Sequence, residues 1–339
     1  MQKIPAVTDE QFEACNEFNK MICEDFLANS TELARKSIGA YRSGLRIWFN
    51  WVRENLGNKP QYEIKPREYL RYQNWLVSLG HSSADISNKR AAISSLNNYI
   101  EVYYSDEYPT FHNFINKSIK KPAPAFVHEK NPPTRAELED MIAKLEDSDR
   151  PNKKELIAYL KFTFETGCRR AEARQIRKDI VNTPVIERTV KVKDKDGNFV
   201  EKTARFYQTP EIRCKGRGTT GKLRKLKFSD YSMDAFKEWL DARGEDDCEY
   251  MFVVKYNGEI KQVGENTFND WSTVIFTPLL GRRFHPHALR EAAATVAVLE
   301  DGKSIEAVRG LLGHESSETT KIYVCGLDED AEADELFVE

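Results

Sequence analysis

Residues Lys117–Pro133 (KSIKKPAPAFVHEKNPP) limit most strongly how this chain can fold. The segment holds four prolines, including a Pro-Ala-Pro step, among several lysines. Proline has no backbone N–H and clashes with the preceding helical turn, so no helix runs through these residues. Thr134–Glu137 (TRAE) follows at once with the spacing of a capping box, which starts a helix. We therefore predict two domains, 1–116 and 134–323, joined by a basic linker over 117–133; 339 residues suffice for two hydrophobic cores.

The first domain is predicted to be helical. Apolar residues recur at a spacing of three and four over Ile38–Val52, in a helix that Ser30 or Thr31 can cap. A second amphipathic helix follows Pro66, and a third begins near Ser82–Ser83. The apolar stripes form the core, whereas the polar faces carry cations: Arg42 and Arg46 on the first helix, Lys89 and Arg90 on the third.

The second domain is predicted to combine helices with a small antiparallel sheet. Asp196-Gly197 is a strong hairpin signal, and a Gly-rich loop (KGRGTTGK) separates two further strand-like segments. The expected strands are Thr189–Val192, Phe199–Tyr207, Glu211–Cys214 and Leu223–Phe228. The expected helices are Glu155–Thr166, a short one through Ile176, Met233–Ala242, Leu289–Leu299 and Ser304–Leu312. The fold class is thus mainly α with a small antiparallel sheet (α+β).

The composition argues against a membrane protein and against a disulfide-built protein. No run of 18 apolar residues occurs, and the N-terminus carries acids where a signal peptide needs an apolar block. We therefore expect a cytoplasmic protein without membrane contact. The six cysteines are scattered, without a Cys-x-x-Cys pair, so neither disulfides nor a metal site is expected, and no cofactor is indicated.

The charge distribution matters more than the net charge of −3. The last segment, Val324–Glu339, holds seven acids and no base, so the rest of the chain carries +4. Between Arg205 and Lys227 there are eight lysines and arginines against one acid, Glu211. A phosphate senses charges within about a Debye length, roughly 10 Å, so this local cationic field suits a polyanionic partner.

Four separated segments each supply a cation or a donor suited to a phosphate. They are Thr166–Glu172 (TGCRRAE), Lys215 in the Gly-rich loop, His287–Arg290 (HALR) and Leu312–Tyr323 (LGHESSETTKIY). Cleaving a phosphodiester without a metal needs guanidinium groups for the non-bridging oxygens, an acid for the leaving alkoxide and a nucleophile that forms an ester. Arginine, lysine, histidine and tyrosine supply these roles, and no cluster of acids resembles a magnesium site.

Taken in order, these segments resemble the tyrosine recombinase (phage integrase, Xer-like) family. TGCRRAE is similar to the box with the family's first arginine, HALR to the box with its second, and LGHESSETTKIY to the last box. The resemblance covers the second domain, and the first is more loosely similar to the family's core-binding domain. It implies an acidic supporting residue, Glu172, and a catalytic set of Arg169, Lys215, His287, Arg290, His314 and Tyr323.

Two positions stay open. Lys222 lies at the far side of the loop that holds Lys215, so either lysine can be the general acid. Arg170 is an alternative to Arg169 by one position. Many family members have a histidine after the second arginine where this chain has Glu291, which leaves the six-residue set intact.

By this resemblance the chain is expected to recombine double-stranded DNA at specific sites. Tyr323 would attack a phosphate to give a 3′-phosphotyrosine, and four protomers, bound as monomers or dimers to each site, would exchange strands through a Holliday junction without metal or ATP. The two domains would close around the duplex as a clamp. The expected DNA contacts are Arg42, Arg46, Lys89, Arg90, Lys120 and Lys121.

The resemblance leaves rival interpretations and further expectations. A type IB topoisomerase would use similar chemistry as a monomer, and a DNA-binding protein with an inactive site is a weaker rival. The acidic tail, 324–339, is expected to dock on a neighbouring protomer, with a solubilising tail as the alternative. We expect no additional arm-binding domain before the helical one, and a nucleoid-associated location.

Overall fold

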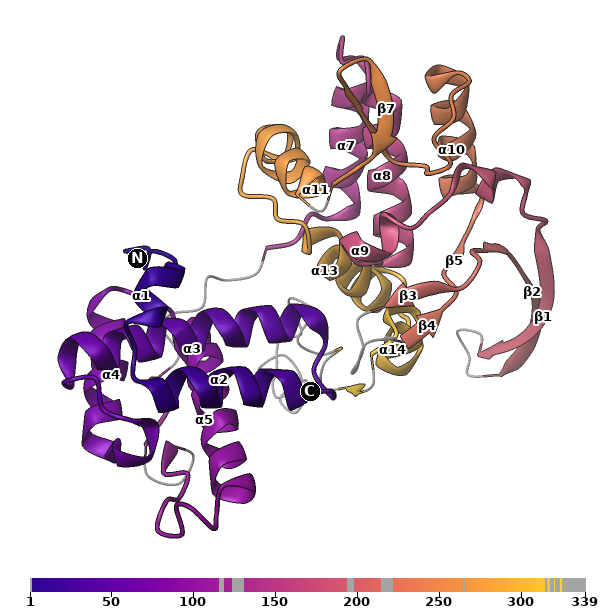
Figure 1. Ribbon diagram of the computed structural model, residues 1–339. Coiled ribbons are helices and arrows are strands. Elements are labelled where there is room, and N and C mark those ends of the chain that lie inside the picture. The colour runs from indigo at the N-terminus through magenta and orange to yellow at the C-terminus, as the bar shows by residue number, and fades with distance from the viewer. Residues whose placement is uncertain are drawn as a thin grey trace. The chain divides into compact units, whose positions relative to one another are not determined.

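The structure is a computed structural model (Figure 1). It describes residues 2–115, 119–123, 131–193, 198–214, 222–264, 266–314, 316–317, 320 and 324, without the side chains of 192 and 193. The chain forms two compact units, whose described residues lie within 2–123 and 131–324. Much of the expected linker lies outside the described residues, so the domain limits stay predictions.

Every regular element described in the first unit is helical, as expected. The helices are α1 Asp9–Glu13, α2 Glu17–Asn29, α3 Arg35–Asn55, α4 Pro66–Ser78 and α5 Ser83–Tyr103, with a short turn of 3-10 helix, η1, at Gln61–Glu63. Pro66 is the first residue of α4, where its missing N–H costs no hydrogen bond. Ser82 caps α5, because its side chain accepts the Asp85 N–H. Two of the predicted helix starts are thus confirmed.

The predicted cap of the long helix α3 is wrong. Ser30 ends α2 instead, where its hydroxyl donates to the Phe26 carbonyl at 2.7 Å. Helix α3 begins at Arg35 after Ala34, which makes no side-chain cap. A serine serves the end of one helix as readily as the start of the next, because its hydroxyl can bond back to the carbonyl four residues earlier.

A buried polar network joins the helices of the first unit. The fully buried Gln61 of η1 accepts a hydrogen bond from Trp48 Nε1 of α3 at 2.8 Å and donates to Asn97 Oδ1 of α5 at 2.7 Å. Its backbone N–H donates to Asn19 Oδ1 of α2 at 2.7 Å. Buried polar groups stabilise a core only when they are paired, and here each bond joins a different helix.

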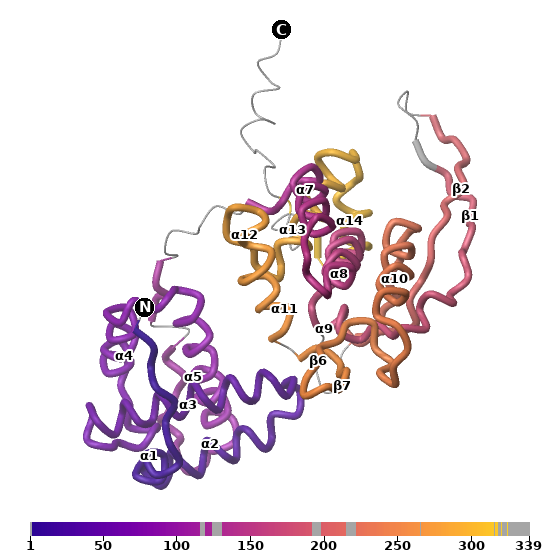
Figure 2. Tube along the Cα trace, turned by 90° about the horizontal axis from the view of Figure 1, so that it is seen from above, coloured from indigo at the N-terminus to yellow at the C-terminus, as the bar shows by residue number. Residues whose placement is uncertain are grey.

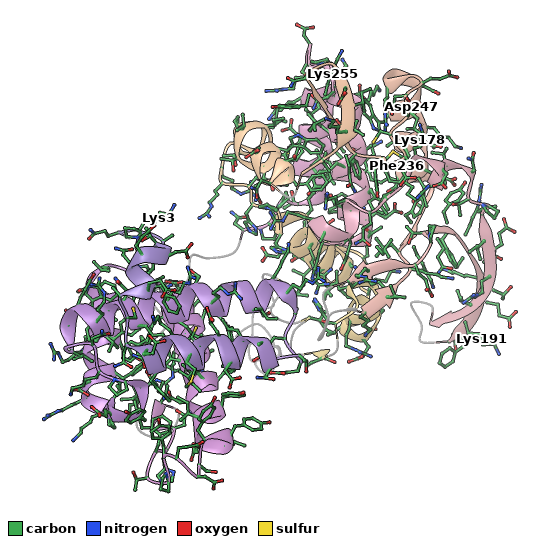
Figure 3. The ribbon with its side chains drawn as sticks, in the orientation of Figure 1. Lys3, Lys178, Lys191, Phe236, Asp247 and Lys255 are labelled. Carbon is green, nitrogen blue, oxygen red and sulfur yellow. The ribbon has the colours of Figure 1, made fainter. Side chains whose placement is uncertain are left out.

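The second unit is built around helix α8. The helical elements of the second unit are α7 Arg135–Glu146, α8 Lys153–Thr166, α9 Arg170–Ala173, η2 Lys178–Asn182, α10 Asp230–Arg243, α11 Thr267–Asp270, η3 Trp271–Phe276, α12 Thr277–Leu280, α13 Ala288–Thr295, η4 Val296–Glu300 and α14 Ile305–Leu312. Helix α8 packs on α7, α10 and α13, and its Phe162 contacts Phe228 and Phe236 in the core. Figure 3 labels Phe236, which lies inside, on α10. The Thr134 capping box before α7 is confirmed.

In the part of the chain that the structure describes, the strands form three small antiparallel sheets, whereas the sequence predicts one. The strands are β1 Ile186–Lys193, β2 Phe199–Gln208, β3 Ile212–Cys214, β4 Lys222–Arg224, β5 Lys227–Phe228, β6 Val253–Tyr256 and β7 Glu259–Gln262. They pair as β1-β2-β5, β3-β4 and β6-β7. In Figure 2, β1 and β2 run side by side away from the helices, and Lys191 of β1 is exposed in Figure 3.

The hairpin β6–β7 was not predicted, although its turn signal is present. Asn257-Gly258 forms the turn with positive φ at both residues, +51° and +84°. An Asn-Gly pair between alternating apolar residues is the strongest short-range hairpin signal, and it favours this geometry. Its flanks, Val253–Tyr256 and Glu259–Gln262, are only four residues each, which is short for a strand pattern.

The described residues bear on membrane-spanning segments and on disulfides. No helix within the described ranges is long and apolar enough to cross a membrane. Five cysteines fall among the described residues, and all five are free: Cys15, Cys23, Cys168, Cys214 and Cys248.

The buried Glu155 predicts how the stability of the second unit depends on pH. Burial raises the pKa of this α8 carboxyl from 4.5 to about 8, although its Oε1 accepts the Val253 N–H at 2.7 Å. Between these two pH values the folded state holds a proton that the unfolded state has lost. The free energy of unfolding therefore falls as pH rises through this window, by up to about 1.4 kcal/mol per pH unit.

Glu155→Gln keeps the acceptor and removes the ionisation. We expect its urea midpoint to change less between pH 6 and pH 8 than that of the unmodified protein, with a gain in stability at pH 8. The exposed Glu211→Gln serves as a control that leaves the pH dependence unchanged. Equal pH slopes for Glu155→Gln and the unmodified protein would contradict this account.

Candidate active site

Gly167 turns the chain from α8 into the first arginine segment. It ends α8 in the left-handed conformation, with φ +57°, which only glycine adopts at low cost. A Cβ at this position would overlap Leu312 of α14, so the absent side chain also lets α14 approach. Arg169 follows as the cap residue of α9. The corner therefore sets where the first predicted arginine stands.

Glu172 holds two arginines from different parts of the chain. It is buried in α9, and its carboxylate accepts the Arg169 N–H at 2.9 Å and Arg169 Nη1 at 3.1 Å. Arg224 of β4 donates through Nη2 to Glu172 Oε2 at 2.6 Å. Burial alone would raise the pKa of Glu172, but Arg224 above all, with Arg169, holds it below its ordinary value. The carboxylate is thus ionised and fixes both guanidinium groups.

Arg290, from the first turn of α13, is among the largest fully buried side chains, with 1% exposure. Its Nη1 donates to the Gly167 carbonyl and its Nη2 to the Leu312 carbonyl at 2.7 Å. Nη2 also lies 2.8 Å from His314 Nε2. The guanidinium therefore joins the end of α8, the end of α14 and the histidine that follows it.

His314 is neutral in this arrangement. A guanidinium can only donate, so His314 Nε2 must accept from Arg290, which leaves the ring proton on Nδ1. Nδ1 lies 3.0 Å from Thr320 Oγ1 and donates to it. Burial, with Arg290, Arg169 and Arg224 nearby, lowers the pKa of His314 to about 4, which agrees with the geometry.

His287 occupies the N-cap position of α13, where its side chain makes no capping hydrogen bond and stays partly open to solvent. Partial burial, then the neighbouring Arg170, His285 and Arg290, lowers the pKa of His287. A neutral, accessible imidazole can accept a proton from a reacting group. Arg170, the alternative to Arg169, has different partners: it donates to Asn269 Oδ1 and lies near His287.

Figure 1 shows α9, α13, α14, β3 and β4 gathered at one end of the second unit. They bring together two predicted arginines and a histidine, through contacts that no short motif specifies. A sequence profile described as the Phage integrase family matches residues 134–329, more than half of the chain. The chain therefore belongs to the phage integrase family. It is a tyrosine-type site-specific recombinase that acts on DNA.

Individual relatives agree with this assignment. The SPbeta prophage-derived recombinase-like protein YomM of Bacillus subtilis (strain 168) is 28% identical over 99% of this chain and 96% of its own length. Tyrosine recombinase XerC of Oceanobacillus iheyensis is 23% identical over 84% of this chain and 83% of its own.

Solved structures share the fold. XerH site-specific recombinase, bound to palindromic difH substrate in a post-cleavage complex, matches with a TM-score of 0.63 and 16% identity, over 100% of this chain and 98% of that one. The Tn1549 transposon integrase in complex with transposon right end DNA gives 0.63 and 14%, over 95% and 99%. At these identities the likeness concerns the fold alone.

Two members of the recombinase's predicted catalytic set, Lys215 and Tyr323, lie outside the described residues. Their chain neighbours are described. Cys214, before Lys215, ends β3 and pairs with Lys222, the alternative lysine, which is exposed. Val324, after Tyr323, is buried in a small cluster with Ala294, Val308 and Leu312. The described neighbours of both residues, Cys214 and Val324, thus belong to the second unit, which also holds the arginines.

Two residues near this site were not predicted. Arg224 stands in the basic run 205–227 and Thr320 in the segment Leu312–Tyr323, but the sequence pattern assigns neither a role of its own. Both are recognised in the structure by their partners, Glu172 and His314. The alternation of β4, which places Arg224 and Lys222 on the same side of the strand, was the available signal.

The predicted DNA contacts of the recombinase have different surroundings. Arg42, Lys120 and Lys121 are exposed. Arg46 pairs with Asp9 at 2.7 Å, and Lys89 with Asp85 at 2.7 Å, so both are already engaged in ion pairs.

Arg90 must be withdrawn as a DNA contact. It is 4% exposed, and its Nη2 donates to the Ile115 carbonyl and, at 2.7 Å, to the Ile119 carbonyl. Its charge therefore holds the segment after α5 inside the first unit. The polar position on the helix suggested a solvated face, but the chain that follows α5 folds back over it.

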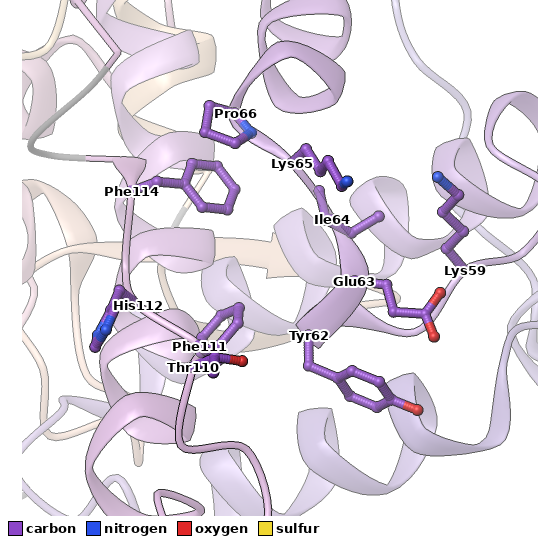
Figure 4. Close-up of a pocket in the computed structure, with 10 residues that line it drawn as sticks. All are labelled: Lys59, Tyr62, Glu63, Ile64, Lys65, Pro66, Thr110, Phe111, His112 and Phe114. Atoms are coloured by element: carbon purple, nitrogen blue, oxygen red, sulfur yellow. The ribbon is translucent and has the colours of Figure 1, made fainter.

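The first unit also has an open pocket of about 590 Å³, lined by both apolar and charged residues (Figure 4). Its walls include Ile64, Phe111 and Phe114, and its Lys59 is neutralised by Glu68 at 2.7 Å. No group of three His, Cys, Asp or Glu residues that could hold a metal occurs in the part of the chain that the structure describes.

The corner at Gly167 yields a test of the site's geometry. Gly167→Ala places a left-handed alanine, which costs roughly 1–2 kcal/mol, and adds the overlap with Leu312. Since the Gly167 carbonyl holds Arg290, we expect both lower stability and slower DNA cleavage. Gly281→Ala is the matched control, because it has φ +75° and nothing within 4 Å of the new Cβ. Equal losses in the two variants, measured by thermal unfolding and cleavage rate, would refute a special role for this corner.

Proposed function

We propose that this recombinase cleaves and rejoins DNA strands through a covalent bond between Tyr323 and a 3′-phosphate. The observation that supports it best is the junction at Arg290, where two arginine segments and the His314 turn meet. A phosphate bound there would face guanidinium groups whose positions are fixed before it arrives. Such preorganisation is the main source of transition-state stabilisation in sites of this kind.

The proposed cleavage proceeds by in-line substitution at phosphorus. The Tyr323 oxygen forms a bond to phosphorus, while the bond between phosphorus and the 5′-oxygen breaks. Arg169 and Arg290 hold the non-bridging oxygens, because their planar forks match phosphate geometry. The energy of the broken ester is retained in the phosphotyrosine, so rejoining needs neither ATP nor a metal ion.

The proton transfers are assigned from the states of the side chains. His287, neutral and partly open to solvent, accepts the phenol proton of Tyr323. Lys215, or Lys222 as the alternative, gives a proton to the departing 5′-oxygen. His314 serves as a neutral hydrogen-bonding partner of Arg290, since its lowered pKa argues against a role as acid at neutral pH.

In the full reaction a 5′-hydroxyl from a second DNA site attacks the phosphotyrosine, and two rounds of this exchange pass through a Holliday junction. Two sites and two strands at each require four protomers. The first unit, 1–116 in this proposal, binds the same duplex through exposed cations such as Arg42, with Lys120 and Lys121 in the linker 117–133. We propose a cytoplasmic, nucleoid-associated location, where the DNA substrate is.

Replacing the nucleophile is the first test. On a nicked suicide DNA, which loses its 5′-hydroxyl fragment after cleavage, the unmodified protein is expected to accumulate a covalent adduct. Tyr323→Phe removes one oxygen and is expected to abolish the adduct while DNA affinity, which rests on phosphate contacts, stays within a factor of about three. Tyr256→Phe, at an exposed position on β6, is the control and should react normally. An adduct that persists in Tyr323→Phe contradicts the assignment.

We further propose that the acidic tail, 324–339, docks on a neighbouring protomer. Its apolar residues Leu336, Phe337 and Val338 lie among acids, a composition that suits a partly apolar, cationic surface. Deleting Asp328–Glu339 should reduce tetramers on paired DNA sites while sparing binding to one site.

A matched variant separates docking from simple solubilisation. Replacing only Leu336, Phe337 and Val338 by alanine keeps every acid of the tail, so a solubilising tail would still work. If docking holds, this variant loses tetramers as the deletion does, measured by native gel mobility or light scattering. Normal assembly by both variants would rule docking out.

A further inference from the structure

Arg224 connects three parts of the second unit that are far apart in the sequence, namely β4, α9 and the end of α14. It stands at the end of β4, in the hairpin whose two strands, β3 and β4, flank the loop segment 215–221. One arm of its guanidinium donates to Glu172 of α9 at 2.6 Å, and the other donates to the Leu311 carbonyl of α14 at 2.9 Å. Its side chain is only 12% exposed.

The site around Arg224 is built to hold it in one place. Gly313, which precedes His314, has φ +66°, and a Cβ there would come within 2.9 Å of Arg224 Nη1. The glycine therefore permits both the turn and the close approach of the guanidinium. Glu172, at 1% exposure, in turn holds Arg169 by two bonds. A displacement of Arg224 would thus disturb both Arg169 and the turn before His314.

The hairpin has a second tether, on its other strand. Gln175, just after α9, donates to the Arg213 carbonyl at 2.8 Å and accepts the Arg213 N–H at 2.9 Å. Strand β3 is thereby attached to the α9 region at one point and β4 at another, through Arg224. The hairpin is therefore held at both of its strands next to the arginine segment.

We propose that Arg224 is a positioning residue for DNA cleavage, which holds the β3–β4 hairpin in register with Glu172, Arg169 and the turn before His314. This rests on the recombinase function proposed above. A purely structural ion pair would need only one acceptor. The second bond, to the Leu311 carbonyl, makes Arg224 a bridge between elements that must stand in register for the general acid and the phosphate-binding groups to act on one phosphate.

The test uses single-turnover cleavage of the nicked suicide DNA at saturating protein, with DNA affinity measured separately. Arg224→Lys keeps the charge but cannot reach two acceptors at fixed angles, and Arg224→Met removes the charge as well. Both are expected to slow adduct formation about 100-fold, the cost of misplacing reacting groups by about 1 Å, with DNA affinity within about threefold. Arg188→Met, an exposed arginine on β1, outside the hairpin and outside the basic run, is the control and should keep the rate.

The pH dependence of the cleavage rate gives a second measurement, which a merely structural role of Arg224 would leave unchanged. His314 is faced by Arg290 of α13, Arg169 and Glu172 at α9, and Arg224 of β4, while Arg309 of α14 bonds its carbonyl. Arg224→Met removes a cation beside both His314 and Glu172, so both bind protons more readily. On the acidic side, the cleavage rate of Arg224→Met should therefore begin to fall at a higher pH than the cleavage rate of Arg224→Lys, which keeps the charge.

The outcomes separate the two proposals. If the unmodified protein forms no adduct, the proposed function fails and this inference with it. If it does, but Arg224→Lys cleaves at the normal rate, the positioning role alone is overturned. Should Arg224→Met not fold, as judged by thermal unfolding, Arg224→Lys still decides, because it retains the ion pair to Glu172. A loss of DNA affinity that fully accounts for slow cleavage would likewise overturn the proposal, since it would make Arg224 a DNA-binding residue.

Discussion

The buried guanidinium of Arg290 is the interaction on which the rest of the catalytic unit depends. A charged group at 1% exposure is stable only when acceptors surround it, and here the acceptors are the carbonyls of Gly167 and Leu312 and the ring of His314. They come from two segments, the end of α8 and the end of α14 with the turn that follows it. The ends of α8 and α14 must therefore converge on α13, and two left-handed glycines, Gly167 and Gly313, make that convergence possible.

The same arrangement leaves a surplus of positive charge where a phosphate is proposed to bind. Arg169 and Arg224 share one buried carboxylate, Glu172, and Arg290 is bonded to neutral acceptors. His314 is neutral, so it adds no charge and can accept from a guanidinium. The surplus is fixed by packing and hydrogen bonds within the protein, so little reorganisation is required when an anion arrives.

The sequence predicted the parts of the site that are local and missed those that depend on register. Arg290 and His314 are each carried by a short motif, and Ser82 and Thr134 start helices as their neighbours indicate. The pairing of Arg224 with Glu172 depends on how β4 aligns with β3 and where the hairpin meets α9, which no short segment encodes.

Other errors have equally specific causes. Arg90 looked like a solvated cation on a helix, but its partners are carbonyls from a segment about 25 residues later, so its burial is a tertiary effect. The Asn257-Gly258 pair is a strong turn signal, but the strands on either side of it are only four residues long, which makes a weak strand pattern. Ser30 was assigned to the wrong helix, because a hydroxyl can end a helix as well as start one.

The central claim is that Tyr323 forms the covalent bond to DNA, and identifying the modified residue in the adduct tests it most directly. Trypsin cuts after Lys321, and the peptide that follows, 322–339, contains no further lysine or arginine and a single tyrosine, Tyr323. An adduct trapped on nicked DNA would be digested with nuclease and trypsin and examined by tandem mass spectrometry. The account predicts a nucleotide remnant on peptide 322–339, located at Tyr323. A remnant on any other peptide would contradict it.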